Sequence, residues 1–89
     1  MTDAPDIVMY SSSWCGYCAR ARALLEGKGV AFREIKVDED PADRAAMLAR
    51  SGGRRTVPQI FIADRHVGGF DELYALDRSG ELDTLLHRA

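Results

Sequence analysis

Short β-favouring runs alternate with helical segments along the chain, and this alternation restricts the fold more than any other feature of the sequence. Runs of apolar and β-branched residues predict strands at Ile7–Ser11, Val30–Val37, Val57–Ala63 and His66–Gly68. Only Asp64 and Arg65 separate the last two runs, so we expect a tight turn that pairs these strands antiparallel.

Helical periodicity fills the segments between the strands. After Cys15, the residues Cys18, Ala21 and Leu25 share one face of a helix that ends near Gly27. Further helices are expected from the cap Asp40-Pro41 to about Arg50, around Leu73 and Leu76, and, beyond Gly80, around Leu82, Leu85 and Leu86. The order βαβαββα predicts an α/β fold with a four-stranded mixed sheet flanked by helices.

Length and charge limit the size and the partners of the protein. The chain has 89 residues, which at roughly 100 to 200 residues per domain predicts a single domain, 1–89. Twelve Lys and Arg stand against fourteen Asp and Glu, so no basic footprint for nucleic acid or an anionic membrane is expected. The longest apolar runs fall far short of the roughly 20 residues of a membrane-spanning helix, so we expect a soluble chain whose partner is small or neutral.

The cysteines and the first residues bear on the compartment. Two cysteines, Cys15 and Cys18, are too few for the disulfide framework of a small secreted domain. The first ten residues carry two aspartates and no basic residue, unlike a secretory signal or a transit peptide. We therefore expect a cytoplasmic location.

The C-x-x-C motif at Cys15 to Cys18 lies where a strand ends and a helix begins. The free N–H groups and the positive dipole end of that helix favour an anion, and the thiolate of Cys15 is the anion available. Cys15 is thus the candidate nucleophile. Cys18 lies one turn further into the helix, where it can resolve a mixed disulfide.

Several neighbouring residues allow more than one interpretation. The cysteines could instead be inert thiols or half of a zinc site, although His66 and His87 lack the usual zinc-ligand spacing and are expected at the surface. Tyr17 must lie beside the sulfurs and is expected to serve the site. Arg22 is expected on a solvated helix face, whereas for Arg20 that interpretation and a contact with a thiolate or an anionic substrate both stay open.

Pro58 opens the third predicted strand, and two interpretations of it stay open. It can be a plain edge-strand proline. It can also follow a cis peptide bond that exposes the backbone of Val57 for pairing with an extended peptide.

Together these residues resemble the glutaredoxin family, and in particular the small bacterial dithiol glutaredoxins. The resemblance covers nearly the whole chain through C-G-Y-C at 15–18, R-T-V-P-Q-I-F-I at 55–62 and G-G-F-D-E-L-Y-A-L at 68–76. It implies a thioredoxin fold and an enzyme that reduces protein disulfides and glutathione mixed disulfides, with glutathione as the reductant. A thioredoxin served by a protein reductase is a third interpretation, which the T-V-P and G-G-F-D segments disfavour.

The resemblance also implies a glutathione site. Its residues fall on Tyr17, Arg44, Thr56, Val57, Pro58, Gly69, Phe70 and Asp71. In this assignment Val57 precedes a cis Pro58, and the backbone of Val57 pairs with the cysteinyl unit of glutathione. The N–H groups of Phe70 and Asp71 hold the γ-glutamyl carboxylate at a helix start. Arg44 reaches the glycyl carboxylate.

Two positions depart from the usual pattern of the family. Ser12 stands where members usually carry a lysine, which removes one cationic contact. Gly16 replaces the commonest proline, and members with Gly or Ser here include some that bind an iron–sulfur cluster. The alternative function is therefore a carrier of a [2Fe-2S] cluster in a homodimer, with Cys15 of each subunit and bound glutathione as ligands. As an enzyme the chain is expected to be a monomer that acts on disulfide-containing or glutathionylated proteins.

Overall fold

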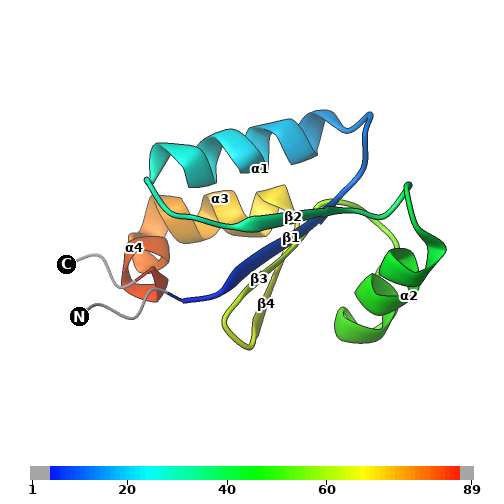
Figure 1. Cartoon of the computed structure of the whole chain (residues 1–89). Helices are drawn as coiled ribbons and strands as arrows, with labels where there is room; N and C mark the ends of the chain where they lie inside the picture. The colour runs from blue at the N-terminus through cyan, green and yellow to red at the C-terminus, as the bar shows by residue number, and fades with distance from the viewer. Residues whose placement is uncertain (1–4, 87–89) are drawn as a thin grey trace.

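The computed structural model describes residues 5–86 and contains one four-stranded sheet with helices packed on both of its faces (Figure 1). In chain order the elements are β1 (Ile7–Ser11), α1 (Gly16–Gly27), β2 (Arg33–Lys36), α2 (Pro41–Arg50), β3 (Gln59–Ile62), β4 (Arg65–Gly68), α3 (Phe70–Ser79) and α4 (Glu81–Leu85). The predicted α/β fold and its βαβαββα order, followed by a short terminal helix, are confirmed.

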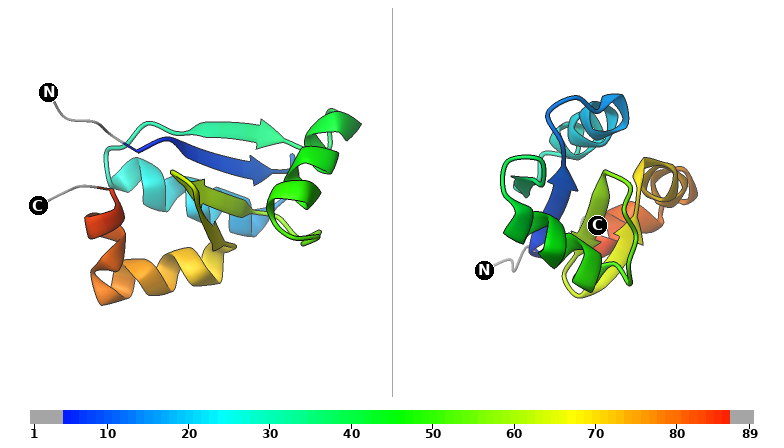
Figure 2. Two further views of the ribbon diagram at one scale, coloured as in Figure 1. Left: turned by 90° about the horizontal axis from the view of Figure 1, so that it is seen from below. Right: turned by 90° about the vertical axis from the view of Figure 1, so that its right-hand side faces the viewer.

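The strands lie in the order β2-β1-β3-β4 (Figure 2). β1 is parallel to β2 and antiparallel to β3, and β3 is antiparallel to β4. Tyr10 near the end of β1 pairs with Gln59 at the start of β3. Gly68 at the end of β4 pairs with Ile60. The end of β1, the start of β3 and the end of β4 therefore meet at one edge of the sheet.

β1 is buried on both faces and divides the core into two clusters. Ile7 and Met9 point to the side of α1, α3 and α4, where they pack with the central residues Ala21, Leu25, Ile60, Leu73 and Leu82. Val8 and Tyr10 point to the side of α2 and pack with Val37, Met47 and Phe61. This two-sided burial explains why β1 begins with a continuous apolar run, Ile7 to Tyr10, rather than an alternating one.

Five strand boundaries differ from the sequence prediction: the starts of β2, β3 and β4, and the ends of β2 and β3, which each come one residue earlier, at Lys36 and Ile62. β2 begins at Arg33 rather than Val30, because Val30 and Phe32 pack against the core before the strand pairing starts. β3 begins at Gln59, after Pro58, which has no N–H to donate. The hairpin turn is Ala63-Asp64, with Ala63 at φ 53°, so the residue predicted in the turn, Arg65, belongs to β4.

The helix ends follow local chemistry. The Asp40 side chain accepts a hydrogen bond of 2.9 Å from the Ala42 N–H and caps α2, whose first residue is Pro41, as predicted. Gly80 has φ 83° and separates α3 from α4. Within residues 5–86, no helix combines the length and the apolar character needed to cross a membrane.

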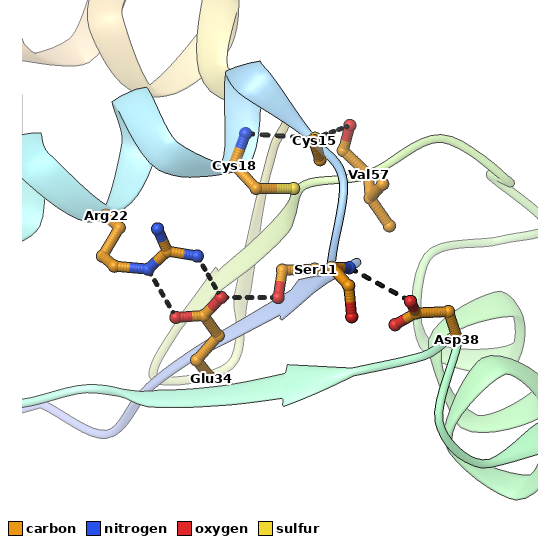
Figure 3. Close-up of polar contacts among 8 residues, drawn as sticks. Ser11, Cys15, Cys18, Arg22, Glu34, Asp38 and Val57 are labelled. Carbon is orange, nitrogen blue, oxygen red and sulfur yellow. Dashed lines mark hydrogen bonds and ion pairs between the residues drawn. The ribbon is translucent and has the colours of Figure 1, made fainter.

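A partly buried polar network joins α1 to β2 behind the C-x-x-C motif (Figure 3). Arg22 Nε donates to Glu34 Oε1 at 2.7 Å, and the buried Ser11 hydroxyl donates to Glu34 Oε2 at 2.7 Å. The expectation that Arg22 lies on a solvated face is therefore wrong: its guanidinium is paired with a mostly buried carboxylate. Glu34 has a lowered pKa, chiefly because Arg22 and then Ser11 donate hydrogen bonds to the carboxylate.

This network predicts how Glu34→Gln changes stability with pH. Because the folded-state pKa of Glu34 is lowered from an ordinary value of 4.5, its ionised form stabilises the fold above about pH 4.5, and this contribution is lost as pH falls through the folded-state pKa. Denaturant unfolding should show Glu34→Gln less stable by about 1 kcal/mol at pH 7. The difference should shrink towards pH 3.

Glu39→Gln is the matched control, because Glu39 is exposed and its replacement makes the same change in net charge. Equal effects of Glu34→Gln and Glu39→Gln at pH 7 would contradict a specific role for the network.

Candidate active site

Cys15 occupies the N-cap of α1, with extended backbone immediately before the helix begins. Its Sγ accepts a hydrogen bond of 3.1 Å from the Cys18 N–H, the bond that a thiolate needs at a helix start. Sγ also lies 3.7 Å from the Val57 carbonyl oxygen, to which the thiol donates. Cys15 is partly exposed, so its sulfur is held in place by backbone groups and open to a reactant.

Cys18 lies one turn later in a different environment. It is fully buried and its thiol is free. Burial, with the hydrogen bond to Cys15, raises the pKa of Cys18 to about 12, and the Ser12 backbone opposes this with a hydrogen bond. The two cysteines are therefore unequal: Cys15 is partly exposed, whereas Cys18 is fully buried and donates its backbone N–H to the Cys15 sulfur (Figure 3).

A cavity of about 290 Å³ opens beside Cys15. Its lining residues come from the start of α1, the segment before β3 and the start of α3: Tyr17, Arg54, Thr56, Val57, Pro58, Gly69, Phe70, Asp71 and Glu72. The Val57–Pro58 peptide bond is cis. Because Val57 both contacts the Cys15 sulfur and lines the cavity, the cavity and the nucleophile form one site.

The start of α3 forms one wall of the cavity. The Glu72 carboxylate accepts a hydrogen bond of 2.6 Å from the Gly69 N–H and lies 3.6 Å from the Arg54 guanidinium. The preceding Gly68 has φ 114°, and a Cβ there would collide with the Glu72 carboxylate. The tight packing of Glu72 over Gly68 and Gly69 fixes where α3 begins.

Aromatic rings form the outer side of the site. The Tyr17 ring stacks on Phe70 with centroids 6.3 Å apart, and Phe70 stacks on Tyr74. The Arg20 guanidinium lies 5.6 Å from the centre of the Tyr17 ring. Arg20 therefore places a cation next to the motif, and its guanidinium contacts the Tyr17 ring rather than a cysteine sulfur.

The structure brings most of the predicted site residues together. Cys15 and the lining residues Tyr17, Thr56, Val57, Pro58, Gly69, Phe70 and Asp71 meet at the same edge of the sheet. Arg44 is exposed on α2 and is not among the residues that line the cavity. The guanidinium that lines the cavity is that of Arg54.

Two lining residues escaped the sequence analysis, namely Arg54 and Glu72. Glu72 could have been found from its position three residues after Gly69, the spacing at which a glutamate reaches back to the first residue of a helix. Arg54 carries no such signal. It reaches the cavity because the loop of Gly52 and Gly53, both with positive φ, turns the chain back towards α3.

His66 differs from the expectation of a surface residue. His66 is partly buried: its Nε2 lies 2.7 Å from Gln59 Oε1 and its ring stacks on Phe61 at 4.7 Å. Burial, assisted by Arg54 and Arg50, lowers the pKa of His66. His87 lies outside the described residues. Across residues 5–86, no group of three or more His, Cys, Asp or Glu side chains is arranged to hold a metal ion.

Cys15 is a partly exposed cysteine at a helix start, Cys18 is buried one turn later, and a cavity lies beside the cis-proline segment. This arrangement is typical of thiol–disulfide oxidoreductases with a thioredoxin-like fold. The glutaredoxin family profile matches residues 7–67. The chain belongs to the glutaredoxin family, the glutathione-dependent disulfide oxidoreductases.

Two bacterial glutaredoxins can be aligned with this chain over almost their whole length. The chain is 55% identical to a glutaredoxin of Pseudomonas aeruginosa over 82 residues, which cover 92% of this chain and 96% of the relative. It is 53% identical to glutaredoxin 3 of Escherichia coli K12 over 81 residues, which cover 91% and 96% of the two chains.

Solved structures confirm the thioredoxin-like fold. The solution structure of a glutaredoxin from Brucella melitensis superposes with a TM-score of 0.83 at 50% identity, covering 98% of this chain and 94% of that one. The crystal structure of a buckwheat glutaredoxin–glutathione complex superposes with a TM-score of 0.83 at 35% identity, covering 93% and 77%.

The unequal environments of the cysteines predict selective alkylation. A short exposure to iodoacetamide at pH 7.5 should modify Cys15 at least tenfold faster than Cys18, because Cys18 is buried and its pKa is raised to about 12. Both lie in one tryptic peptide that ends at Arg20, so fragment-ion mass spectrometry assigns the site. In denaturant the two rates should converge. Equal rates in the folded protein would contradict the assignment of roles.

Proposed function

We propose that the chain reduces protein disulfides and glutathione mixed disulfides, with Cys15 as the nucleophile and Cys18 as the resolving thiol. One observation carries the proposal: Val57, whose carbonyl oxygen lies 3.7 Å from Cys15 Sγ, is also a wall of the cavity. A tripeptide bound in that cavity has its cysteine close to the reactive sulfur, which is the arrangement that disulfide exchange requires.

The exchange proceeds in two steps. The Cys15 thiolate attacks one sulfur of the substrate disulfide, the S–S bond breaks, and the departing thiolate takes a proton from solvent. A second thiolate then attacks the resulting mixed disulfide. When the mixed disulfide joins Cys15 to glutathione and a second glutathione attacks the glutathione sulfur, the products are the Cys15 thiolate and glutathione disulfide. When Cys18 attacks the Cys15 sulfur of a mixed disulfide, the products are the Cys15–Cys18 disulfide and the released substrate thiol, and two molecules of glutathione then reduce the Cys15–Cys18 disulfide to two thiols and form glutathione disulfide.

The cavity offers groups that match each part of glutathione. The Val57 backbone can pair with the cysteinyl unit, in extended conformation. At the start of α3, the N–H groups of Phe70 and Asp71 suit the γ-glutamyl carboxylate, and the Asp71 carboxylate suits the neighbouring ammonium group. Tyr17 and Phe70 form the apolar side.

The glycyl carboxylate of glutathione needs a cation, and two arginines are candidates. The resemblance assigns this role to Arg44, whereas Arg54 is the arginine that lines the cavity. Its guanidinium lies 3.6 Å from the Glu72 carboxylate in a part-exposed pair, which leaves donors available to a ligand. We therefore propose Arg54 for the glycyl carboxylate.

Protein substrates must reach Cys15 from outside. Trp14, next to the nucleophile, is 96% exposed, and Tyr17 is 58% exposed. These rings provide an apolar surface around the sulfur on which a protein disulfide can rest. We propose that the enzyme acts as a monomer of one domain, in a reducing cytoplasm that keeps both thiols free.

Cluster binding stands second as a proposal. The chain by itself offers Cys15 as a partly exposed sulfur ligand, so a [2Fe-2S] cluster would need a second copy and glutathione. A Cβ added at Gly16 meets nothing within 4 Å, so the motif has space on its outer side. Anaerobic reconstitution with iron, sulfide and glutathione decides the matter, and a colourless monomer excludes this function.

The division of roles between the cysteines predicts two different phenotypes. Cys15→Ser should lose at least 99% of its activity in an assay coupled to glutathione reductase, whatever the substrate, because no other sulfur is exposed in the site. Cys18→Ser should keep reduction of a glutathionylated peptide within about threefold, because glutathione resolves that intermediate. It should lose most activity on an intramolecular protein disulfide. Equal losses of Cys18→Ser on both substrates would contradict the roles.

The different positions of Arg54 and Arg44 predict different effects of their substitution on the KM for glutathione. Arg54→Ala should raise the KM for glutathione about threefold to tenfold, because it removes the cation that lines the cavity. Arg44→Ala is the matched control, with the same change of charge at an exposed position, and should change the KM less than twofold. The reverse result would assign the glycyl carboxylate to Arg44 on α2 and contradict the role of Arg54.

A further inference from the structure

Gln59 is a fully buried polar residue at the start of β3, and both ends of its side-chain amide are bonded. Its Nε2 donates to the carbonyl oxygen of Thr56 at 3.0 Å and to Thr56 Oγ1 at 3.1 Å. Its Oε1 lies 2.7 Å from His66 Nε2. Because a carbonyl oxygen can only accept, the nitrogen of the amide must face Thr56 and its oxygen must face His66.

This orientation determines the protonation of His66. The Gln59 oxygen has no hydrogen to donate, so His66 Nε2 must carry one. The ring is fixed by its stacking on Phe61, with centroids 4.7 Å apart and planes 20° from parallel. Burial lowers the pKa of His66, which favours the neutral ring with its hydrogen on Nε2.

The same logic determines the direction of the Thr56 hydroxyl. Its oxygen accepts from Gln59 Nε2, so its own hydrogen cannot point back at Gln59. Thr56 is exposed and lines the cavity beside Cys15. The hydroxyl is therefore free to donate into the cavity.

We propose that Gln59 and His66 are positioning residues that hold the Thr56 hydroxyl as a hydrogen-bond donor to an acceptor oxygen of bound glutathione. The order of donation runs from His66 Nε2–H to Gln59 Oε1, from Gln59 Nε2–H to Thr56 Oγ1, and from Thr56 Oγ1–H to the ligand. The proposal rests on the proposed function, because it requires that glutathione occupies the cavity.

The test measures glutathione recognition as an equilibrium. In a Cys18→Ser background, Cys15 exchanges with glutathione disulfide to give the Cys15–glutathione mixed disulfide and one free glutathione. Mass spectrometry at several ratios of the two glutathione forms gives the equilibrium constant. If no mixed disulfide forms at all, the proposed function fails, and this outcome is distinct from failure of the positioning role.

Three variants distinguish an effect on the direction of the Thr56 hydroxyl from a general loss of folded structure. Thr56→Val removes the donor and should lower the constant about threefold to tenfold, whereas Thr56→Ser keeps the hydroxyl and should stay within twofold of the parent. Gln59→Glu presents a carboxylate that accepts the Thr56 hydrogen and turns it away from the cavity, so it should match Thr56→Val. Combined with Thr56→Val, Gln59→Glu should add no further loss. An unchanged constant in Gln59→Glu or in Thr56→Val, or additive losses in the double variant, would overturn the proposal.

A spectroscopic measurement tests the chain of donors without any substitution. Long-range proton–nitrogen correlation at pH 8 on the ¹⁵N-labelled protein distinguishes the two neutral forms of an imidazole ring. We expect His66 to carry its hydrogen on Nε2. A hydrogen on Nδ1 would mean that the Gln59 amide faces the other way, so that Thr56 donates to Gln59 rather than to the ligand, and the proposal would be wrong.

Discussion

Burial of β1 on both faces is the constraint on which the rest of the structure depends. Its four apolar residues alternate between the cluster under α1, α3 and α4 and the cluster under α2, so a shift of one residue would exchange the two cores. The resulting register sets Tyr10 opposite Gln59 and places the end of β1 beside the start of β3. Cys15, four residues past β1, and Val57, two residues before β3, come together for this reason.

The active site is thus assembled from segments that flank the strands rather than from the strands themselves. The loop after β1 supplies Cys15, the segment before β3 supplies Val57 and Pro58, and the start of α3 supplies a wall of the cavity. Each segment is attached to a strand of the same sheet, whose pairing limits their relative movement. A rigid sheet with irregular segments at one edge combines a fixed geometry with backbone groups that are free to bind a ligand.

Much of this arrangement could be predicted from the sequence, because its signals are local. Asp40-Pro41 predicts the start of α2 by cap chemistry, and the C-x-x-C motif predicts a sulfur at a helix start. Contacts between residues distant in the sequence were harder to predict. Arg22 reaches Glu34, and His66 reaches Gln59, only because the tertiary fold brings them together. The start of β2 was predicted too early, at Val30, because Val30 and Phe32 are apolar. An apolar residue indicates burial but does not show that its backbone pairs with a neighbouring strand.

The burial of Cys18 has a consequence for how the reduced protein meets reagents in solvent. Desolvation, and then the hydrogen bond to Cys15, raises the pKa of Cys18 to about 12, so in the reduced protein this thiol keeps its proton at neutral pH. Its sulfur is enclosed by the core, whereas Cys15 is partly exposed. Burial within α1 therefore shields the second thiol from oxidants in solvent while keeping it one helical turn from Cys15.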